Sequence, residues 1–316
     1  MSVWITDYIN NPSVEEQVLG KVLSDSKKHQ AKVLLVWHQE INKKFISNFP
    51  NLKGVVRYGV GYDNIDVNLL KRKGIVFCNN PDYGVDEVSD TALAMILNFS
   101  RKISSYNHIA KSLHHSWQEQ TIKSILRSKD TKVGIIGAGR IGSSLILKLN
   151  SLNYQTMFYD PYVPSGYEKT LNTKRADSLI NLLKDSNFIS LHCPLNTETK
   201  GMVDKKFINH LKKGSFIINT ARGGLLLSND LIYENIINGK IEGVGLDVTI
   251  DEPPLKGDKL INLWSKDNKL SQKIIINPHS AYYSKQSYKE MRVNAAKKAL
   301  DILEGKTPKD IILSQS

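Results

Sequence analysis

Short apolar runs alternate with amphipathic stretches along almost the whole chain, and this alternation is the strongest constraint on its fold. Runs rich in branched and aromatic residues are typical of buried strands, and the stretches between them carry apolar residues at helical spacing. Such strands are expected at residues 3–6, 33–37, 54–58, 75–78, 132–136, 155–159, 187–191, 215–219, 242–248 and 273–277. We therefore expect an α/β protein with two doubly wound parallel-sheet domains.

Length and composition agree with two globular domains. The chain has 316 residues, of which 41% are hydrophobic and 23% charged, and a domain typically takes about 150 residues. No apolar run approaches the roughly 20 residues of a membrane span, and the N-terminus lacks the basic and apolar regions of a signal peptide. The two cysteines, Cys78 and Cys193, predict neither a disulfide framework nor a metal site. We expect a cytoplasmic protein that has no membrane partner.

The chain is basic, with 43 Lys and Arg against 31 Asp and Glu, a difference of +12. A basic protein can attract nucleic acid, anionic lipid or small anions. The lysines are scattered, and no block of like charges or aromatic-interleaved basic helix occurs. This pattern favours a solvated basic surface that attracts small anionic substrates, and we expect no nucleic-acid partner.

One glycine-rich run has the context of a dinucleotide site. Gly137, Gly139 and Gly142 match G-x-G-x-x-G, after the expected strand 132–136 and before a helical apolar pattern. Glycine is needed there because a pyrophosphate must approach bare backbone donors at a helix N-terminus. The run therefore predicts a phosphate loop.

The next expected strand is followed by an acidic residue, Asp160, 18 residues past Gly142. A carboxylate at this point binds the adenosine ribose hydroxyls and repels a 2′-phosphate, which favours NAD over NADP. The ATPase alternative, G-x-x-x-x-G-K-[ST], fails because Ser143 stands where the lysine must be.

Four polar residues lie at the carboxyl ends of three later strands, where ligands bind in open α/β sheets. Arg222 follows one strand, Asp247 closes the next and Glu252 follows it, and His279 follows the last. Arginine can bind a carboxylate through two parallel hydrogen bonds, and histidine can transfer a proton. A neighbouring carboxylate would stabilise imidazolium and fix its tautomer. With a nicotinamide cofactor, these groups suffice for hydride transfer on a 2-oxo or 2-hydroxy acid.

Motifs along the whole chain resemble the D-isomer-specific 2-hydroxyacid dehydrogenases, a family that includes phosphoglycerate dehydrogenases. Within the family, the chain is most similar to the branch of the C-terminal binding proteins. Residues 82–88, 159–162, 278–286 and 290–292 carry this resemblance. The family motifs lie at residues 57–66, 137–142, 158–161, 192–195, 219–224, 245–248, 252–253 and 278–279.

The resemblance implies roles for the strand-end residues. Arg222 would bind the substrate carboxylate and polarise the carbonyl, His279 would be the general acid/base, and Glu252 its partner. Substrate binding would also involve Tyr282 and the backbone donors of Tyr58, Gly59 and Val60. The implied cofactor residues are Gly137, Gly139, Arg140, Ile141, Gly142, Asp160, Cys193, Thr220, Ala221 and Asp247, of which Asp247 would hold the nicotinamide amide.

The resemblance also implies a domain order. A Rossmann NAD-binding domain at 84–286 would be inserted into a flavodoxin-like substrate domain formed by 1–83 and 287–316. The family further implies a homodimer built on the nucleotide domain, and a small anionic 2-oxo or 2-hydroxy acid as the substrate.

Two features depart from the family pattern. The interval between Glu252 and His279 is long, and its lysine-rich middle, 255–273, reads as an inserted loop. Tyr282 stands where the animal corepressors of this branch carry Trp. Two other functions stay open at this point: an NAD(H)-gated binding protein with incidental dehydrogenase activity, and formate oxidation on the same fold. The residues do not identify the 2-hydroxy acid.

Overall fold

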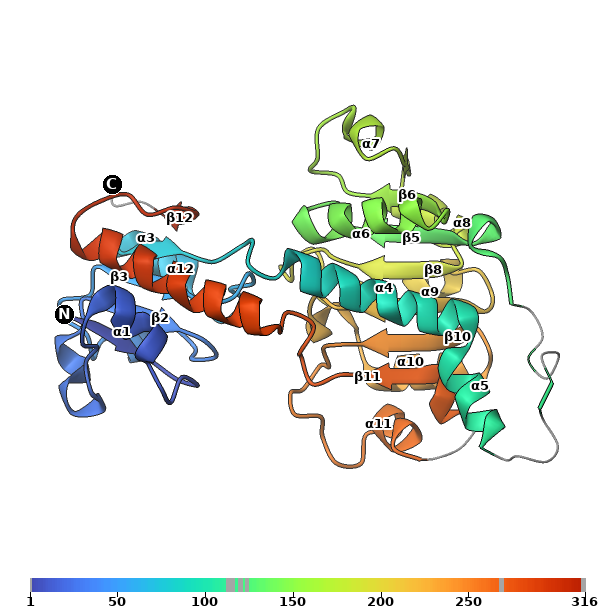
Figure 1. Cartoon of the computed structure of the whole chain (residues 1–316), viewed down its shortest axis with the longest axis horizontal. Coiled ribbons are helices and arrows are strands. Elements are labelled where there is room, and N and C mark those ends of the chain that lie inside the picture. The colour runs from blue at the N-terminus through green and yellow to red at the C-terminus, as the bar shows by residue number, and fades with distance from the viewer. Residues whose placement is uncertain (1, 112–116, 119–121, 123–124, 267–269, 314–316) are drawn as a thin grey trace. The chain divides into compact units, whose positions relative to one another are not determined.

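The computed structural model describes residues 2–111, 117–118, 122, 125–266 and 270–313. The chain divides into two compact units (Figure 1). Unit 1 comprises 1–84 and 283–316, and unit 2 comprises 85–282. The boundaries between the units in the sequence therefore lie at 84/85 and 282/283. The expected boundaries were 83/84 and 286/287.

Unit 1 contains a five-stranded sheet in the order β1-β2-β3-β4-β12. The first four strands are parallel, and β12 pairs antiparallel with β4. The apolar pattern did not predict β12, a three-residue strand at the sheet edge. The elements are β1 (Val3–Ile5), α1 (Ser13–Leu19), η1 (Asp25–Gln30), β2 (Val33–Val36), α2 (Lys43–Ile46), β3 (Gly54–Arg57), α3 (Val67–Arg72), β4 (Val76–Cys78), α12 (Lys285–Leu303) and β12 (Ile311–Leu313).

Helices cover both faces of this sheet because its strands are apolar on both sides. Val55 belongs to a buried cluster with residues of α2 and α3. Its neighbour Gly54 faces the other way, and a Cβ added there would lie 2.8 Å from Ile302 of α12. Helix α12 also packs against α1 and β2, so the last long helix completes the core that the first strands begin.

Unit 2 contains a seven-stranded parallel sheet in the order β11-β10-β9-β8-β5-β6-β7. The α/β class with two parallel sheets is confirmed. The elements are α4 (Val85–Arg101), α5 (Ile103–Ala110), η3 (Ser128–Asp130), β5 (Lys132–Ile136), α6 (Arg140–Ser151), β6 (Gln155–Tyr159), α7 (Tyr167–Thr170), β7 (Lys174–Arg175), α8 (Leu179–Asp185), β8 (Phe188–Leu191), α9 (Lys205–His210), β9 (Ser215–Asn219), η4 (Gly223–Leu225), α10 (Asn229–Ile237), β10 (Ile241–Leu246), α11 (Lys259–Trp264), η5 (Ser271–Lys273) and β11 (Ile274–Ile276).

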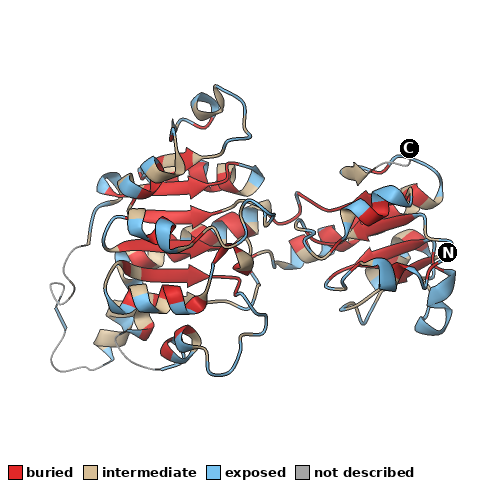
Figure 2. Cartoon of the chain, turned by 180° about the vertical axis from the view of Figure 1, so that it is seen from behind, coloured by how far each residue is buried: buried red, intermediate tan, exposed pale blue. Residues whose placement is uncertain are grey.

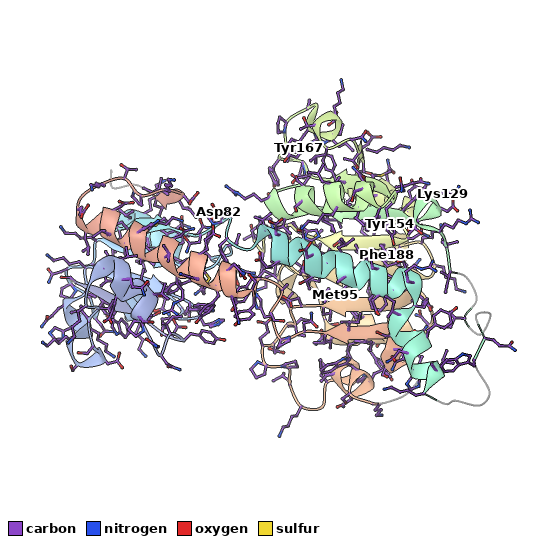
Figure 3. The ribbon with its side chains drawn as sticks, in the orientation of Figure 1. Asp82, Met95, Lys129, Tyr154, Tyr167 and Phe188 are labelled. Carbon is purple, nitrogen blue, oxygen red and sulfur yellow. The ribbon has the colours of Figure 1, made fainter. Side chains whose placement is uncertain are left out.

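Two apolar layers sandwich the unit 2 sheet. Helices α4 and α6 lie side by side on one face (Figure 1), where Met95, Tyr154 and Phe188 belong to one buried cluster (Figure 3). The alternate residues of the same strands, such as Ile189 and Ile217, join a second cluster with α8, α9 and α10. Figure 2 accordingly shows the strands as buried, while the helices expose their outer faces.

The segment 255–273 contains more structure than an inserted loop. Asp258 caps α11 by accepting hydrogen bonds from the N–H groups of Leu260 and Ile261. Leu260 and Leu263 are buried in the second apolar cluster. The expectation of a loop is wrong over this helix, because the lysines around it obscure the spacing of its two buried leucines.

A buried ion pair links the two chain segments of unit 1. Glu15 on α1 is fully buried and accepts hydrogen bonds from Arg292 Nε at 2.8 Å and Arg292 Nη2 at 2.5 Å. The Tyr58 hydroxyl donates a third bond to Glu15, at 2.9 Å. A buried charge needs such compensation because its desolvation is costly.

We expect Glu15→Gln to destabilise unit 1 by about 3–5 kcal/mol, because Arg292 then keeps a buried charge without a charged partner. Urea unfolding followed by tryptophan fluorescence measures this loss, since Trp4 and Trp37 are buried in unit 1. Glu16→Gln, one position away on the less buried side of the helix, is the control for lost charge. Equal losses in both variants would contradict the prediction.

Candidate active site

The phosphate loop connects β5 to α6. The N–H of Gly137 donates to Tyr159 O on β6 at 3.0 Å, and the N–H of Ala138 donates to Asp160 Oδ2 at 2.9 Å. Gly139 is the N-cap residue of α6 and has no side chain to cap the helix. The first N–H groups of a twelve-residue helix are therefore available to an anion.

Three glycines make this loop fit a pyrophosphate, each for its own reason. Gly137 has φ +91°, and a Cβ there would lie 2.7 Å from the Cys193 nitrogen at the end of β8. A Cβ on Gly142 would lie 2.0 Å from Gly137 O, so the helix could not pack on the loop. A Cβ on Gly139 would meet nothing within 4 Å. The first two glycines allow the tight turn, and the third leaves open space beside bare backbone.

The other expected cofactor residues lie around this loop. The Asp160 carboxylate also accepts a bond from the N–H of Tyr162, at 2.9 Å. The buried Thr220 hydroxyl at the end of β9 has no hydrogen-bond partner among the residues that the structure describes. Such an orphaned polar atom is costly unless a ligand satisfies it. These observations fit a bound dinucleotide. Arg140 and Ile141 form the first turn of α6, and Ala221 follows Thr220.

Cys193 faces the core rather than the loop. Its Sγ lies 3.7 Å from Met202 Sδ, and burial raises the pKa of the thiol to about 11. The neighbouring His192 hydrogen-bonds Ser190 Oγ through Nε2 at 2.8 Å, and desolvation lowers its pKa to about 4. At neutral pH the thiol is protonated and this histidine is neutral, so neither is suited to proton transfer.

Glu252 and His279 form a direct pair. His279 Nδ1 lies 2.7 Å from Glu252 Oε2, and the other oxygen of Glu252 accepts from the N–H of Thr249 at 3.1 Å. Burial opposes ionisation of Glu252. The hydrogen bond and charge of His279, the Thr249 N–H and the charge of Arg222 nevertheless bring the pKa of Glu252 below its ordinary value. Glu252 is therefore a carboxylate at neutral pH, with the His279 imidazole bonded to it and the positive charge of Arg222 nearby.

The charge of Arg222 acts on Glu252 because the loops after β9 and β10 touch through their backbones. A Cβ on Gly223 would lie 1.9 Å from Thr249 O, so only glycine fits. The Asn219 side chain fixes the turn by donating to Arg222 O at 2.8 Å and accepting from the N–H of Ala221 at 3.0 Å. The structure thus brings Arg222, Glu252 and His279 to the carboxyl edge of one sheet.

Asp247 fixes the backbone that carries His279. Its buried carboxylate accepts the N–H groups of Ser280 and Ala281, both at 3.0 Å, and its carbonyl oxygen accepts the N–H of His279 at 2.7 Å. His279 has φ +52°, a left-handed conformation that non-glycine residues rarely adopt. Burial raises the pKa of Asp247. This contact is absent from the sequence analysis, although Asp247 and His279 end neighbouring strands.

The remaining expected residues belong mostly to unit 1. The N–H of Tyr58 donates to Val36 O at 2.9 Å, so it is already bonded within the sheet. Of the three backbone donors expected to bind the substrate, Gly59 and Val60 remain. Sequence reasoning missed Asp7, whose carboxylate accepts the N–H groups of three consecutive residues, 37–39, at 2.6–3.1 Å. Tyr282, half-buried, is the last residue of unit 2.

The described residues contain no group of three or more His, Cys, Asp or Glu side chains that could hold a metal ion. Among the same residues, no helix is both long and apolar enough to cross a membrane.

Comparisons with known proteins agree on one family. Residues 93–281 match the model of the D-isomer specific 2-hydroxyacid dehydrogenase, NAD binding domain. C-terminal-binding protein 1 of Caenorhabditis elegans is 32% identical over 94% of this chain, and D-3-phosphoglycerate dehydrogenase of Methanocaldococcus jannaschii is 30% identical over 86%. These matches span only 40% and 50% of the two relatives.

A solved structure covers nearly the whole fold. D-lactate dehydrogenase from Aquifex aeolicus, complexed with NAD and lactic acid, superposes with a TM-score of 0.85 at 27% identity, over 96% of this chain and 95% of that one. The family model alone covers more than half of the 316 residues. The chain belongs to the D-isomer specific 2-hydroxyacid dehydrogenase family.

Proposed function

We propose that the protein is an NAD-dependent oxidoreductase that transfers a hydride between nicotinamide and C2 of a small D-2-hydroxy or 2-oxo acid. The observation that carries the proposal is the 2.7 Å pair of Glu252 and His279 beside the charge of Arg222. This group lies at the same sheet edge as the phosphate loop. A carboxylate-binding cation and a proton donor are the groups that reduction of a 2-oxo acid requires.

Arg222, His279 and Glu252 each have a separate role in this proposal. Arg222 binds the substrate carboxylate and polarises the neighbouring carbonyl. His279 uses Nδ1 for Glu252, so Nε2 donates the proton to the carbonyl oxygen during reduction and accepts it back during oxidation. Glu252 stabilises the protonated imidazole and fixes its orientation. When bound at the phosphate loop, a nicotinamide dinucleotide would supply the hydride for C2.

For the units, we propose that unit 2 binds the dinucleotide and forms a homodimer. The resemblance to the family supports both proposals. The substrate-binding roles of Gly59 and Val60 stay predictions from that resemblance.

For the cofactor, we propose NAD rather than NADP. Asp160 supports this choice, because its carboxylate is fixed by the N–H groups of Ala138 and Tyr162 at the end of β6. An ionised carboxylate there accepts ribose hydroxyls and repels a 2′-phosphate.

A second candidate is a binding protein whose binding to a partner depends on NAD(H), and the similarity to C-terminal-binding protein 1 is the reason to test it. The group of Arg222, Glu252 and His279 supports the enzyme instead, since a pure sensor needs no acid/base pair. A panel of 2-oxo acids with NADH separates the two: tight NADH binding without turnover of any acid would support the sensor.

Replacing His279 by Ala should lower kcat for reduction at least about 100-fold, the scale of general acid–base catalysis, while NADH affinity stays near the parent value. Steady-state assays with glyoxylate, hydroxypyruvate, phosphohydroxypyruvate and larger 2-oxo acids measure the loss. His29→Ala, at an exposed position of η1, is the control. A His279→Ala variant as fast as the parent would refute the assigned role.

The parent should prefer NADH over NADPH by about 100-fold in kcat/KM. With NADPH, the 2′-phosphate would lie beside the Asp160 carboxylate, and the two anionic groups would repel each other. Asp160→Ser should reduce this preference, since serine can still hydrogen-bond the ribose without repelling a phosphate. Paired assays with both cofactors give the ratio. A parent enzyme that prefers NADPH would show that Asp160 does not select the cofactor.

Glu252→Gln should shift the alkaline limb of the pH profile for reduction to lower pH. The pKa of Glu252 is lowered, so the parent keeps a carboxylate beside the imidazole across the assay range. Without that charge the protonated imidazole is less favoured, and reduction loses its proton donor at a lower pH. Asp251→Asn, the adjacent exposed carboxylate, is the control. An unchanged or upward-shifted limb argues against the pairing.

A further inference from the structure

A hydrogen bond that the proposed mechanism does not use joins the loops after β6 and β8. The Tyr162 hydroxyl donates to a carboxylate oxygen of Glu198. Both residues are exposed, and Tyr162 keeps 75% of its surface accessible. The faces of the Tyr162 ring are therefore accessible to a ligand, while its hydroxyl is already bonded.

Each end of this bridge is fixed by its own loop. On the β6 side, Asp160 Oδ1 accepts the N–H of Tyr162 at 2.9 Å, and Arg175 donates to Asp160 O at 2.8 Å. On the β8 side, Asn196 Oδ1 accepts the N–H of Glu198 at 2.9 Å and that of the next residue at 3.0 Å. The two side chains therefore meet from backbones of defined position.

The bridge spans the phosphate loop. In the sheet, β5 lies between β8 and β6, and the loop after β5 contacts both neighbours. Gly137 donates to Tyr159 O on β6 and packs against the Cys193 nitrogen that follows β8. The hydrogen bond between Tyr162 and Glu198 therefore runs from one side of the phosphate loop to the other. It lies on the side of the loops that follow the strand ends, where Asp160 also lies.

This position matches the adenosine half of a dinucleotide. If Asp160 holds the adenosine ribose, the base attached to that ribose must lie close to the residues that follow Asp160. Tyr162 is two residues further along the chain. An aromatic ring can stack on a purine, and a ring whose hydroxyl is already anchored loses less side-chain entropy when the base binds.

We propose that Tyr162 and Glu198 form an adenosine strap, in which the ring of Tyr162 stacks on the adenine of the cofactor and Glu198 positions that ring. Tyr162 is the binding residue, and Glu198 is a positioning residue that acts through it. The inference rests on the proposed dinucleotide function. The strap strengthens binding of the adenosine half of the cofactor alone, and it slows dissociation of the whole cofactor.

Calorimetry with ADP-ribose and with nicotinamide mononucleotide tests each half of the cofactor separately. Tyr162→Ala should weaken ADP-ribose binding about tenfold, as expected for loss of base–aromatic stacking, and leave the mononucleotide unaffected. Stopped-flow displacement should show NADH leaving faster from this variant by about the same factor. Neither readout depends on turnover.

The role of Glu198 needs a readout that a general surface effect would not give. Glu198→Ala and Tyr162→Phe should each weaken ADP-ribose binding about threefold, and the double variant should be no weaker than either single variant. Glu198→Gln keeps an oxygen that accepts the phenol proton and should restore affinity. Glu304→Ala, which removes an exposed carboxylate bonded to Lys306 in unit 1, is the matched control.

The outcomes separate this inference from the proposed function. If the parent binds NADH and Tyr162→Ala binds ADP-ribose as tightly as the parent or more tightly, the strap is refuted and the dehydrogenase proposal stands. Equal weakening of both half-ligands also refutes it. If the parent binds neither NADH nor ADP-ribose, the proposed function and the strap fail together.

Discussion

Parallel pairing within the unit 2 sheet is the constraint on which the candidate site depends. The last residues of six strands are paired neighbour to neighbour across the sheet, so that their following loops start at one level: Tyr159, Ile136, Leu191, Asn219, Leu246 and Ile276. Parallel strands place all carboxyl ends on one edge. The phosphate loop, Arg222 and the pair of Glu252 and His279 are far apart in the sequence, and this pairing brings them to one edge of the sheet.

Close backbone contacts then set the distances within that edge. The phosphate loop and the Arg222 turn each contain a glycine whose Cβ would overlap a backbone oxygen, at 2.0 Å for Gly142 and 1.9 Å for Gly223. Backbone atoms cannot move aside as a flexible side chain can. The Gly142 contact fixes helix α6 against the phosphate loop, and the Gly223 contact fixes the separation of the loops after β9 and β10. The long side chains of Arg222 and Glu252 extend from these last two loops.

The sequence predicted the parallel sheets and the phosphate loop because apolar runs and glycine spacing are local signals. It did not predict β7, whose two residues are Lys174 and Arg175, since pairing with β6 rather than hydrophobicity makes it a strand. Nor did it predict the contacts of Asp7 and Asp247 with distant N–H groups, which arise only when strands become neighbours. The partner of His279 came from family resemblance, because 27 residues separate it from Glu252.

The buried pair of Glu15 and Arg292 has a consequence for how the protein is made. Its members are 277 residues apart in the chain, and the whole of unit 2 is encoded between them. At ribosomal rates of about 5–20 residues per second, Arg292 is synthesised roughly 15–55 s after Glu15. During that interval unit 2 can fold as a continuous segment, whereas the first four strands of unit 1 remain without helix α12. The nascent N-terminal segment is therefore the part of this protein with the longest exposure to chaperones and to misfolding.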